Sequence, residues 1–235
     1  MSDKHLSSQF DSDLNQVCSR VLEMGGLVES QIVNAMQALN NFDRGLIETV
    51  RAQEHKLNAM EIEIDEECSN IIARRQPAAR DLRLLMAISK TITNLERAGD
   101  EAEKIAKRTG RIMDDAAGHS LNHSEIKIAG DMAVALLRRT LDAFARLDVA
   151  EAAEIVRDDK AIDDEFRAFV RKLVTYMMED PRTISVGLDF LFIAKAVERI
   201  GDHAKNIAEF VIYIVRGTDV RHVSQEDLER EALGK

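Results

Sequence analysis

Two stretches 102 positions apart, Glu96-Arg97-Ala98-Gly99-Asp100 and Glu198-Arg199-Ile200-Gly201-Asp202, repeat one helical phrase. The likeness extends outward, because seven of thirteen residues agree between 95–107 and 197–209, where chance would give about one. Each phrase sets two carboxylates four positions apart, which a helix places one turn apart on one face, with a glycine between them. The chain is therefore expected to contain an internal repeat with a duplicated acidic face.

Composition predicts an all-α protein. The 235 residues are rich in helix formers, aromatic residues make up only 4%, Trp is absent and there are two prolines. Pro77 and Pro181 lie 104 positions apart, nearly the spacing of the repeated phrase, and each follows a long stretch with apolar residues at helical spacing. Each proline is expected to mark a helix hairpin. The fold predicted is two tandem, repeated three-helix bundles, with six long helices arranged up-down-up in each half.

The predicted boundaries follow from the same signals. Around 110–122 the sequence is rich in Gly, Asp, Asn, His and Ser, as a linker would be. We expect a first repeat at 1–112, a linker at 113–122, a second repeat at 123–216 and a charged C-terminal tail at 217–235 with a short helix at most.

Charge and hydropathy exclude several classes of protein. The net charge is −10, the isoelectric point is near 5.2 and no basic run exceeds two residues, so nucleic acid is not an expected partner. No apolar run is longer than that at 210–215, which is far short of the ~18 residues that a membrane-spanning helix needs. We expect a cytoplasmic protein.

Counting along the two hairpins brings acidic residues on neighbouring helices to one level. Glu54 lies about 22 residues before the first turn, whereas Glu96 and Asp100 lie about 20 and 24 residues after it. The second hairpin places four acids opposite one another in the same way. The predicted metal ligands are Glu54, Glu96 and Asp100 in the first half and Asp159, Asp163, Glu198 and Asp202 in the second.

Carboxylate oxygens favour hard ions, so Mg²⁺, Mn²⁺, Ca²⁺ or iron is expected rather than Zn²⁺, which prefers His or Cys. The alternative is that Arg97, Arg199 and nearby lysines neutralise these acids as ordinary ion pairs. A catalytic role is not favoured: no histidine has a Glu three residues before it, as di-iron bundle enzymes require, and no nucleophile or phosphate-loop motif occurs. No catalytic or other cofactor-binding residue is predicted, although a carboxylate-bridged metal enzyme stays an alternative.

The sequence resembles the PhoU family of phosphate-specific transport system accessory proteins. The resemblance rests on 76–83 (Gln-Pro-Ala-Ala-Arg-Asp-Leu-Arg) together with both repeated phrases, and 217–223 resembles proteobacterial members in particular. It implies a homodimeric negative regulator of the phosphate regulon and of phosphate uptake, without catalysis of its own. The implied partners are the ATPase of the phosphate ABC transporter and the sensor histidine kinase of the phosphate two-component system.

The family also binds multinuclear metal clusters, and its acidic motif falls on the seven candidate ligands given above. One position departs from the pattern: Asn58 stands where the second half has Asp163. An amide brings no charge, so the first site is expected to bind its cation more weakly or with fewer metals. The rival interpretation is a metal-independent helical scaffold. Metal-bridged peripheral attachment to membrane lipids is a further possibility.

Overall fold

The structure, a computed structural model, describes residues 8–115 and 121–233, and within these ranges it contains helices and no strand. The first repeat comprises α1 (Ser8–Asn41), α2 (Arg44–Arg75) and α3 (Ala79–Asp114). The second comprises α4 (Ser124–Arg146), α5 (Val149–Glu179), the 3-10 turn η1 (Pro181–Thr183) and α6 (Ile184–Arg216), and the tail carries α7 (Gln225–Leu233). The prediction of an all-α protein built from two three-helix repeats is confirmed.

Local capping explains where the long helices begin and end. Asp43 accepts hydrogen bonds from the backbone N–H groups of the first turn of α2, and Asp148 does the same for α5. Helix α2 ends at Arg75, its C-cap residue Gln76 has a left-handed φ of 49°, and Pro77 follows directly. Pro181 occupies the first position of η1. Both prolines therefore mark hairpin turns, as the sequence predicts.

The inter-repeat segment differs from its expected form at its first residues. Helix α3 continues through Gly110 and ends at Asp114, so the chain is still helical where a Gly-, Asp- and Ser-rich linker was expected to start. Ile112, the last buried residue of α3, explains the extension because its apolar side chain packs into the core. Residues 116–120 of the expected linker lie outside the described part of the chain.

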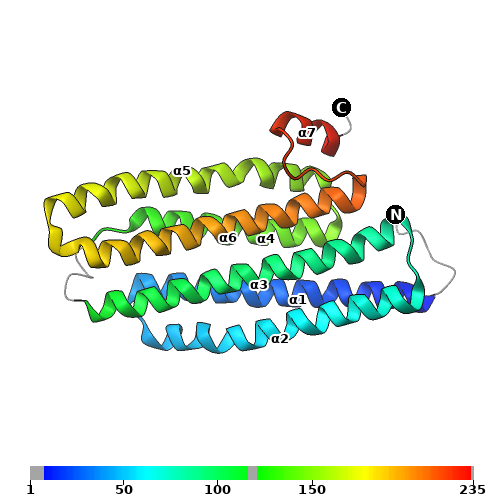
Figure 1. Ribbon diagram of the computed structural model, residues 1–235, viewed down its shortest axis with the longest axis horizontal. Coiled ribbons are helices and arrows are strands. Elements are labelled where there is room, and N and C mark those ends of the chain that lie inside the picture. Colours follow the sequence, from blue (N-terminus) through cyan, green and yellow to red (C-terminus); the bar gives the residue numbers. More distant parts are fainter. Residues whose placement is uncertain (1–7, 116–120, 234–235) are drawn as a thin grey trace.

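The two repeats lie side by side as layers, with α3 and α6 packed together along the middle of the molecule (Figure 1). Asn94 on α3 meets His203 on α6, with 3.1 Å between the amide oxygen and Nδ1. Further along α3, Arg108 lies 2.7 Å from Asp189, near the start of α6. Partner numbers thus fall along α6 as they rise along α3, so the helices are antiparallel and the hairpin turns lie at opposite ends of the molecule.

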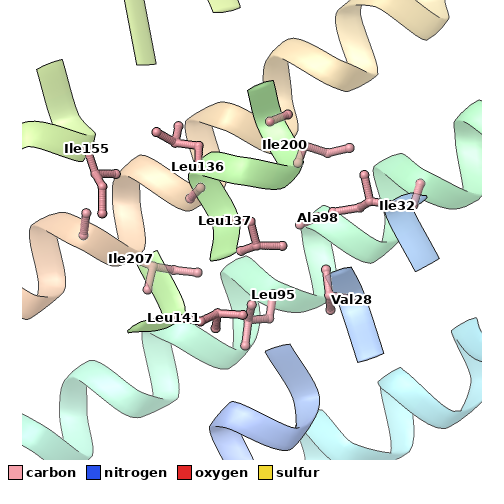
Figure 2. Close-up of a cluster of buried hydrophobic side chains, with 14 of the residues drawn as sticks. Val28, Ile32, Leu95, Ala98, Leu136, Leu137, Leu141, Ile155, Ile200 and Ile207 are labelled. Carbon is pink, nitrogen blue, oxygen red and sulfur yellow. The ribbon is translucent and has the colours of Figure 1, made fainter. Parts of the chain in front are cut away.

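One hydrophobic core runs through both repeats. Figure 2 shows Val28 and Ile32 of α1 and Leu95 of α3 gathered with Leu137 and Leu141 of α4. These side chains are buried, as are Ile200 and Ile207 of α6 beside them. The bundles therefore share an interior instead of each enclosing its own. Although apolar faces are extensive, every helix of residues 8–115 and 121–233 falls short of the apolar length that a bilayer crossing needs.

The glycine of each repeated phrase lies where two helices approach closely. A Cβ atom added to Gly99 on α3 would overlap the side chain of Leu57 on α2 and would lie 2.9 Å from Gln31 Oε1. The same addition at Gly201 on α6 would lie 2.9 Å from both Asp159 Oδ1 and Ile162 Cδ1 on α5. Each glycine thus allows the acidic residue of the preceding helix to sit against the helix that carries the phrase.

Alanine substitutions should reveal this packing. Gly99→Ala is expected to lower the free energy of unfolding by about 1–3 kcal/mol, because the added methyl group overpacks the α2–α3 contact. Gly201→Ala should cost less. Gly26→Ala is the control, because nothing lies within 4 Å of its added Cβ, and it should stabilise by up to about 1 kcal/mol through helix propensity. Urea unfolding measures all three, and similar effects for Gly99 and Gly26 would contradict the packing argument.

Candidate metal centre

Three carboxylates of the first repeat converge on one point. Glu54 of α2 and Glu96 and Asp100 of α3 each offer an oxygen, and these oxygens lie within 4.8 Å of one another. Such spacing allows one cation to touch all three. Among the residues that the structure describes, no other three His, Cys, Asp or Glu side chains come together in this way. The hairpin count therefore brought these three residues together correctly.

Glu54 is the buried member of this first acidic group, with 8% of its surface exposed. Its Oε2 accepts a 2.8 Å hydrogen bond from the side-chain amide of Gln31 on α1. Its Oε1 is buried and has no hydrogen-bond partner in residues 8–115 and 121–233. A buried carboxylate oxygen without a partner is costly. The residues fit a cation, because an ion held by the three carboxylates would meet that unsatisfied charge.

The electrostatics of the first acidic group show the same lack of positive charge. Burial raises the pKa of Glu54, the negative charges of Asp100 and Glu103 raise it further, and the Gln31 amide opposes them. Burial likewise raises the pKa of Glu96, and Asp100 and Glu61 add to it. Since the ionised forms repel one another, a bound cation would lower both pKa values.

The second repeat places its four acids differently, because cations pair with three of them. Lys205 Nζ lies 3.4 Å from Asp159 Oδ2, and Lys195 Nζ lies 2.6 Å from Glu198 Oε1. Asp163 Oδ2 is 3.7 Å from Arg167 Nη2. Burial raises the pKa of Asp159 to about 6 although Lys205 opposes it, and burial and Glu198 raise the pKa of Asp202. Three of these four residues, the second acidic group, therefore have a cation from the chain itself, and the four do not form a compact trio. Asp202 has no ion pair in the described residues, and Glu198 Oε2 is buried there without a hydrogen-bond partner.

Comparing the repeats position by position explains the difference. Under the 102-residue offset, Lys205 corresponds to Glu103 and Lys195 to Thr93; under the 105-residue offset of the preceding helices, Arg167 corresponds to Ile62. The second acidic group therefore has three cations that the first lacks. The sequence contains this signal, but an alignment limited to the acids of the motif does not reveal it.

The histidines and cysteines contribute no ligand to either acidic group in the described parts of the chain. His55 is exposed, and His203 points its Nδ1 toward Asn94 on α3. Cys18 and Cys68 are free thiols, and burial raises their pKa values to about 11 and about 12. A thiol that stays protonated is a poor metal ligand. The candidate centre therefore has oxygen donors alone.

Fold and site together define a duplicated helical-bundle protein with an acidic group in each repeat. The chain belongs to the PhoU family: the PhoU domain matches it twice, over 21–109 and 126–211. It is 60% identical over 234 residues to a phosphate-specific transport system accessory protein PhoU homolog of Burkholderia sp, an alignment that covers 99% of this chain and all of the relative. The proteobacterial resemblance seen in the sequence is thereby confirmed.

Solved structures agree with the fold. The crystal structure of PhoU from Pseudomonas aeruginosa superposes with a TM-score of 0.86 at 47% identity, over 89% of this chain and all of that one. The phosphate transport system regulatory protein PhoU from Streptococcus pneumoniae gives a TM-score of 0.83 at 27% identity, over 90% of this chain and 99% of that one. The fold is thus the same in a distant relative.

Glu209 is a buried acid beyond the second acidic group, on α6, with 8% of its surface exposed. Burial raises its pKa to about 7, while the positive charges of Lys205 and Arg221 oppose the shift and Asp219 and Asp159 support it. The folded protein therefore holds this proton at pH values where the unfolded chain, with an ordinary Glu pKa near 4.5, has released it. Stability must then fall as pH rises from about 4.5 to about 7.

Glu209→Gln is expected to remove that loss. The variant and the parent should be equally stable near pH 4, and the variant should become more stable by about 1–2 kcal/mol at pH 8, allowing for partial solvent screening. Urea unfolding from pH 4 to 8 in the presence of a chelator measures the difference. Glu66→Gln, at an exposed position on α2, is the control and should show no such trend. A pH-independent difference would contradict the assignment.

Proposed function

We propose that this protein is a metal-binding, non-catalytic adaptor that restrains phosphate signalling and uptake. It links the ATPase of a phosphate ABC transporter to the sensor histidine kinase of a phosphate two-component system. The observation that carries the proposal is the convergence of Glu54, Glu96 and Asp100 within a PhoU-family bundle. The relatives' names, an accessory protein of phosphate-specific transport and a phosphate transport system regulatory protein, support a role in that system.

The three carboxylates of the first acidic group would hold a hard divalent ion such as Mg²⁺ or Mn²⁺, with iron also compatible and Zn²⁺ less suited to all-oxygen ligation. The ion's positive charge would offset the repulsion between α2 and α3 at this point. The second acidic group already has Lys195, Lys205 and Arg167. We therefore reverse the order expected from Asn58 and propose that the first group binds metal more tightly than the second.

The adaptor role is consistent with the surface charge. A net charge of −10 favours basic segments on the partners and speeds their association. We propose a cytoplasmic homodimer, as the family resemblance implies. The rival, a metal-independent scaffold, would use the same helices without an ion. A metal enzyme would need a general base and an open coordination position in addition to the metal. The proposed adaptor needs neither of these.

Metal titration separates the two acidic groups. After chelator treatment, saturating Mg²⁺ or Mn²⁺ should stabilise the parent by about 2–3 kcal/mol at a hundredfold excess over the dissociation constant. Glu96→Gln with Asp100→Asn should abolish most of this gain, and should make the metal-free protein more stable because repelling charge is removed. Glu198→Gln with Asp202→Asn should keep more than half of it. Thermal unfolding with and without metal provides the measurement.

If the Glu198→Gln, Asp202→Asn variant instead lost more of the metal stabilisation, the second acidic group would be the tighter site, as expected from Asn58. An unchanged response in both double variants would remove metal binding from both acidic groups and favour the metal-independent scaffold.

Gene deletion tests the regulatory part. Loss of the protein should derepress alkaline phosphatase in phosphate-rich medium, and the parent gene should restore repression. If metal is needed for the adaptor, the Glu96→Gln, Asp100→Asn gene should restore it incompletely at an equal protein level. Full restoration would favour the metal-independent scaffold, whereas unaltered phosphatase in the deletion strain would count against the regulatory role itself.

A further inference from the structure

The arginine of each repeated phrase forms no ion pair with either acidic group in the described residues, although the charge of Arg97 lowers the pKa of Glu96. Arg97 and Arg199 are both exposed. Arg97 makes no hydrogen bond or ion pair with any residue of 8–115 or 121–233, and Arg199 makes a single ion pair, with Glu101 at 3.3 Å. A duplicated arginine that stabilises little within the fold is free to bind something outside it.

Both arginines line the same groove, which lies between α3 and α6 and has a volume of about 620 Å³. The antiparallel packing of these helices explains why. Glu101 of α3 lies opposite Arg199 of α6, so Arg97, one turn earlier on α3, lies opposite the region of His203. Each repeat thus contributes its arginine to the groove from the opposite side.

Positive charge gathers in this groove although the protein as a whole is acidic. Its four basic side chains are Arg97, Lys104, Arg199 and Lys205. Three carboxylates also line it, so its cations exceed its carboxylates by one. Glu101 is buried against Lys104 and Arg199, while Asp100 and Asp202 belong to the two acidic groups. Arg97 keeps its full hydrogen-bonding capacity, and Arg199 keeps the donors that Glu101 does not use. The free donors in the groove are therefore those that anions seek.

The arrangement of the donors indicates the kind of anion. A guanidinium presents a planar fork of donors that matches two phosphate oxygens. The cations come from two helices, and Arg97 and Lys104 lie seven residues, or about 10 Å, apart along α3. That is more than the width of a single phosphoryl group. No Phe, Tyr or Trp side chain lines this groove, and its one aromatic ring, that of His203, is held by Asn94 at 3.1 Å, so a nucleobase would find little surface for stacking. A ligand with linked phosphoryl groups therefore fits the groove better than a nucleoside does.

We propose that this groove binds an anion with two or more phosphoryl groups, with Arg97 and Arg199 as its main contacts. Inorganic pyrophosphate is the simplest such ligand, and the paired phosphates of a cardiolipin headgroup present the same chemistry at a membrane. A ligand held by both arginines would join α3 to α6 and so tie the two repeats together. This site adjoins both acidic groups, because Asp100 and Asp202 also line the groove. A chelator in the test removes metal ions, so that any anion binding is due to the arginines and not to a bound metal.

The test measures binding of pyrophosphate, orthophosphate and sulfate to the full-length protein by calorimetry in chelator. Pyrophosphate should bind more tightly than the other two anions. Arg97→Gln with Arg199→Gln should weaken pyrophosphate binding at least about tenfold, because each arginine supplies charge-assisted hydrogen bonds. Replacing both with Lys keeps the charge but loses the fork, and should restore affinity only in part. Thermal unfolding of each variant verifies that it folds.

The matched control is Arg157→Gln with Arg182→Gln, which removes the same charge from side chains that are 58% and 88% exposed and lie outside the groove. It should change affinity less than twofold. A second arm measures sedimentation with phosphatidylcholine vesicles that contain cardiolipin.

If the groove variant loses pyrophosphate binding but keeps vesicle binding, and the control variant keeps both, a soluble ligand is supported. If the groove variant instead loses only the binding to cardiolipin vesicles, the lipid source is supported. Equal losses in groove and control variants, or binding of neither ligand by the parent, would overturn the proposal.

Discussion

The antiparallel contact of α3 with α6 is the interaction on which the rest of the structure depends. Each of these helices carries one copy of the repeated phrase, and each also packs against the two other helices of its own repeat. Their apolar faces close the core that both repeats share, and polar pairs such as Arg108 with Asp189 fix the register along the seam. This part-buried pair, whose side chains are 29% and 16% exposed, disfavours slipped alternatives because a shift would leave its charges unpaired. The register in turn decides that the arginines of the two phrases line one groove.

Within each repeat, the glycine of the repeated phrase allows the preceding helix to pack closely. It lets Leu57 and Glu54 approach α3, and Ile162 and Asp159 approach α6, more closely than any side chain would permit. Close approach buries a carboxylate, which raises its pKa and creates a need for positive charge. The two repeats meet that need differently. Asp159 has Lys205, whereas Glu54 has the amides of Gln31 and, more weakly, of Asn58 but no cation, and its Oε1 has no partner in the described structure.

Much of the fold could be predicted from local signals. Pro77 and Pro181 mark the hairpins because proline cannot continue a helix, and the apolar spacing gave the long helices. The rotation between the repeats could not be predicted, because two identical phrases carry no information about how their helices are oriented relative to each other. Composition around 110–122 is typical of a linker, but α3 continues to Asp114, because glycine is only a weak helix breaker when its neighbours, such as Ile112, are buried.

For the candidate site, the sequence predicts how far along the bundle each acid lies, but not which other side chains point toward it. Counting residues from a turn gives the height of a side chain along a bundle, and for Glu54, Glu96 and Asp100 height was enough. In the second repeat the same count found acids of equal height. There, however, Lys195 of α6 pairs with Glu198, and Lys205 of α6 pairs with Asp159. Charge balance around a site therefore decides what the acids do, and it depends on residues at i±3 that a motif omits. Both acidic groups include acids of the same repeated phrase, so the difference between them lies in single substitutions. Where the second repeat has Lys205 to pair with its buried acid, the first has Glu103 at the corresponding position, and its acids need a cation from outside the chain.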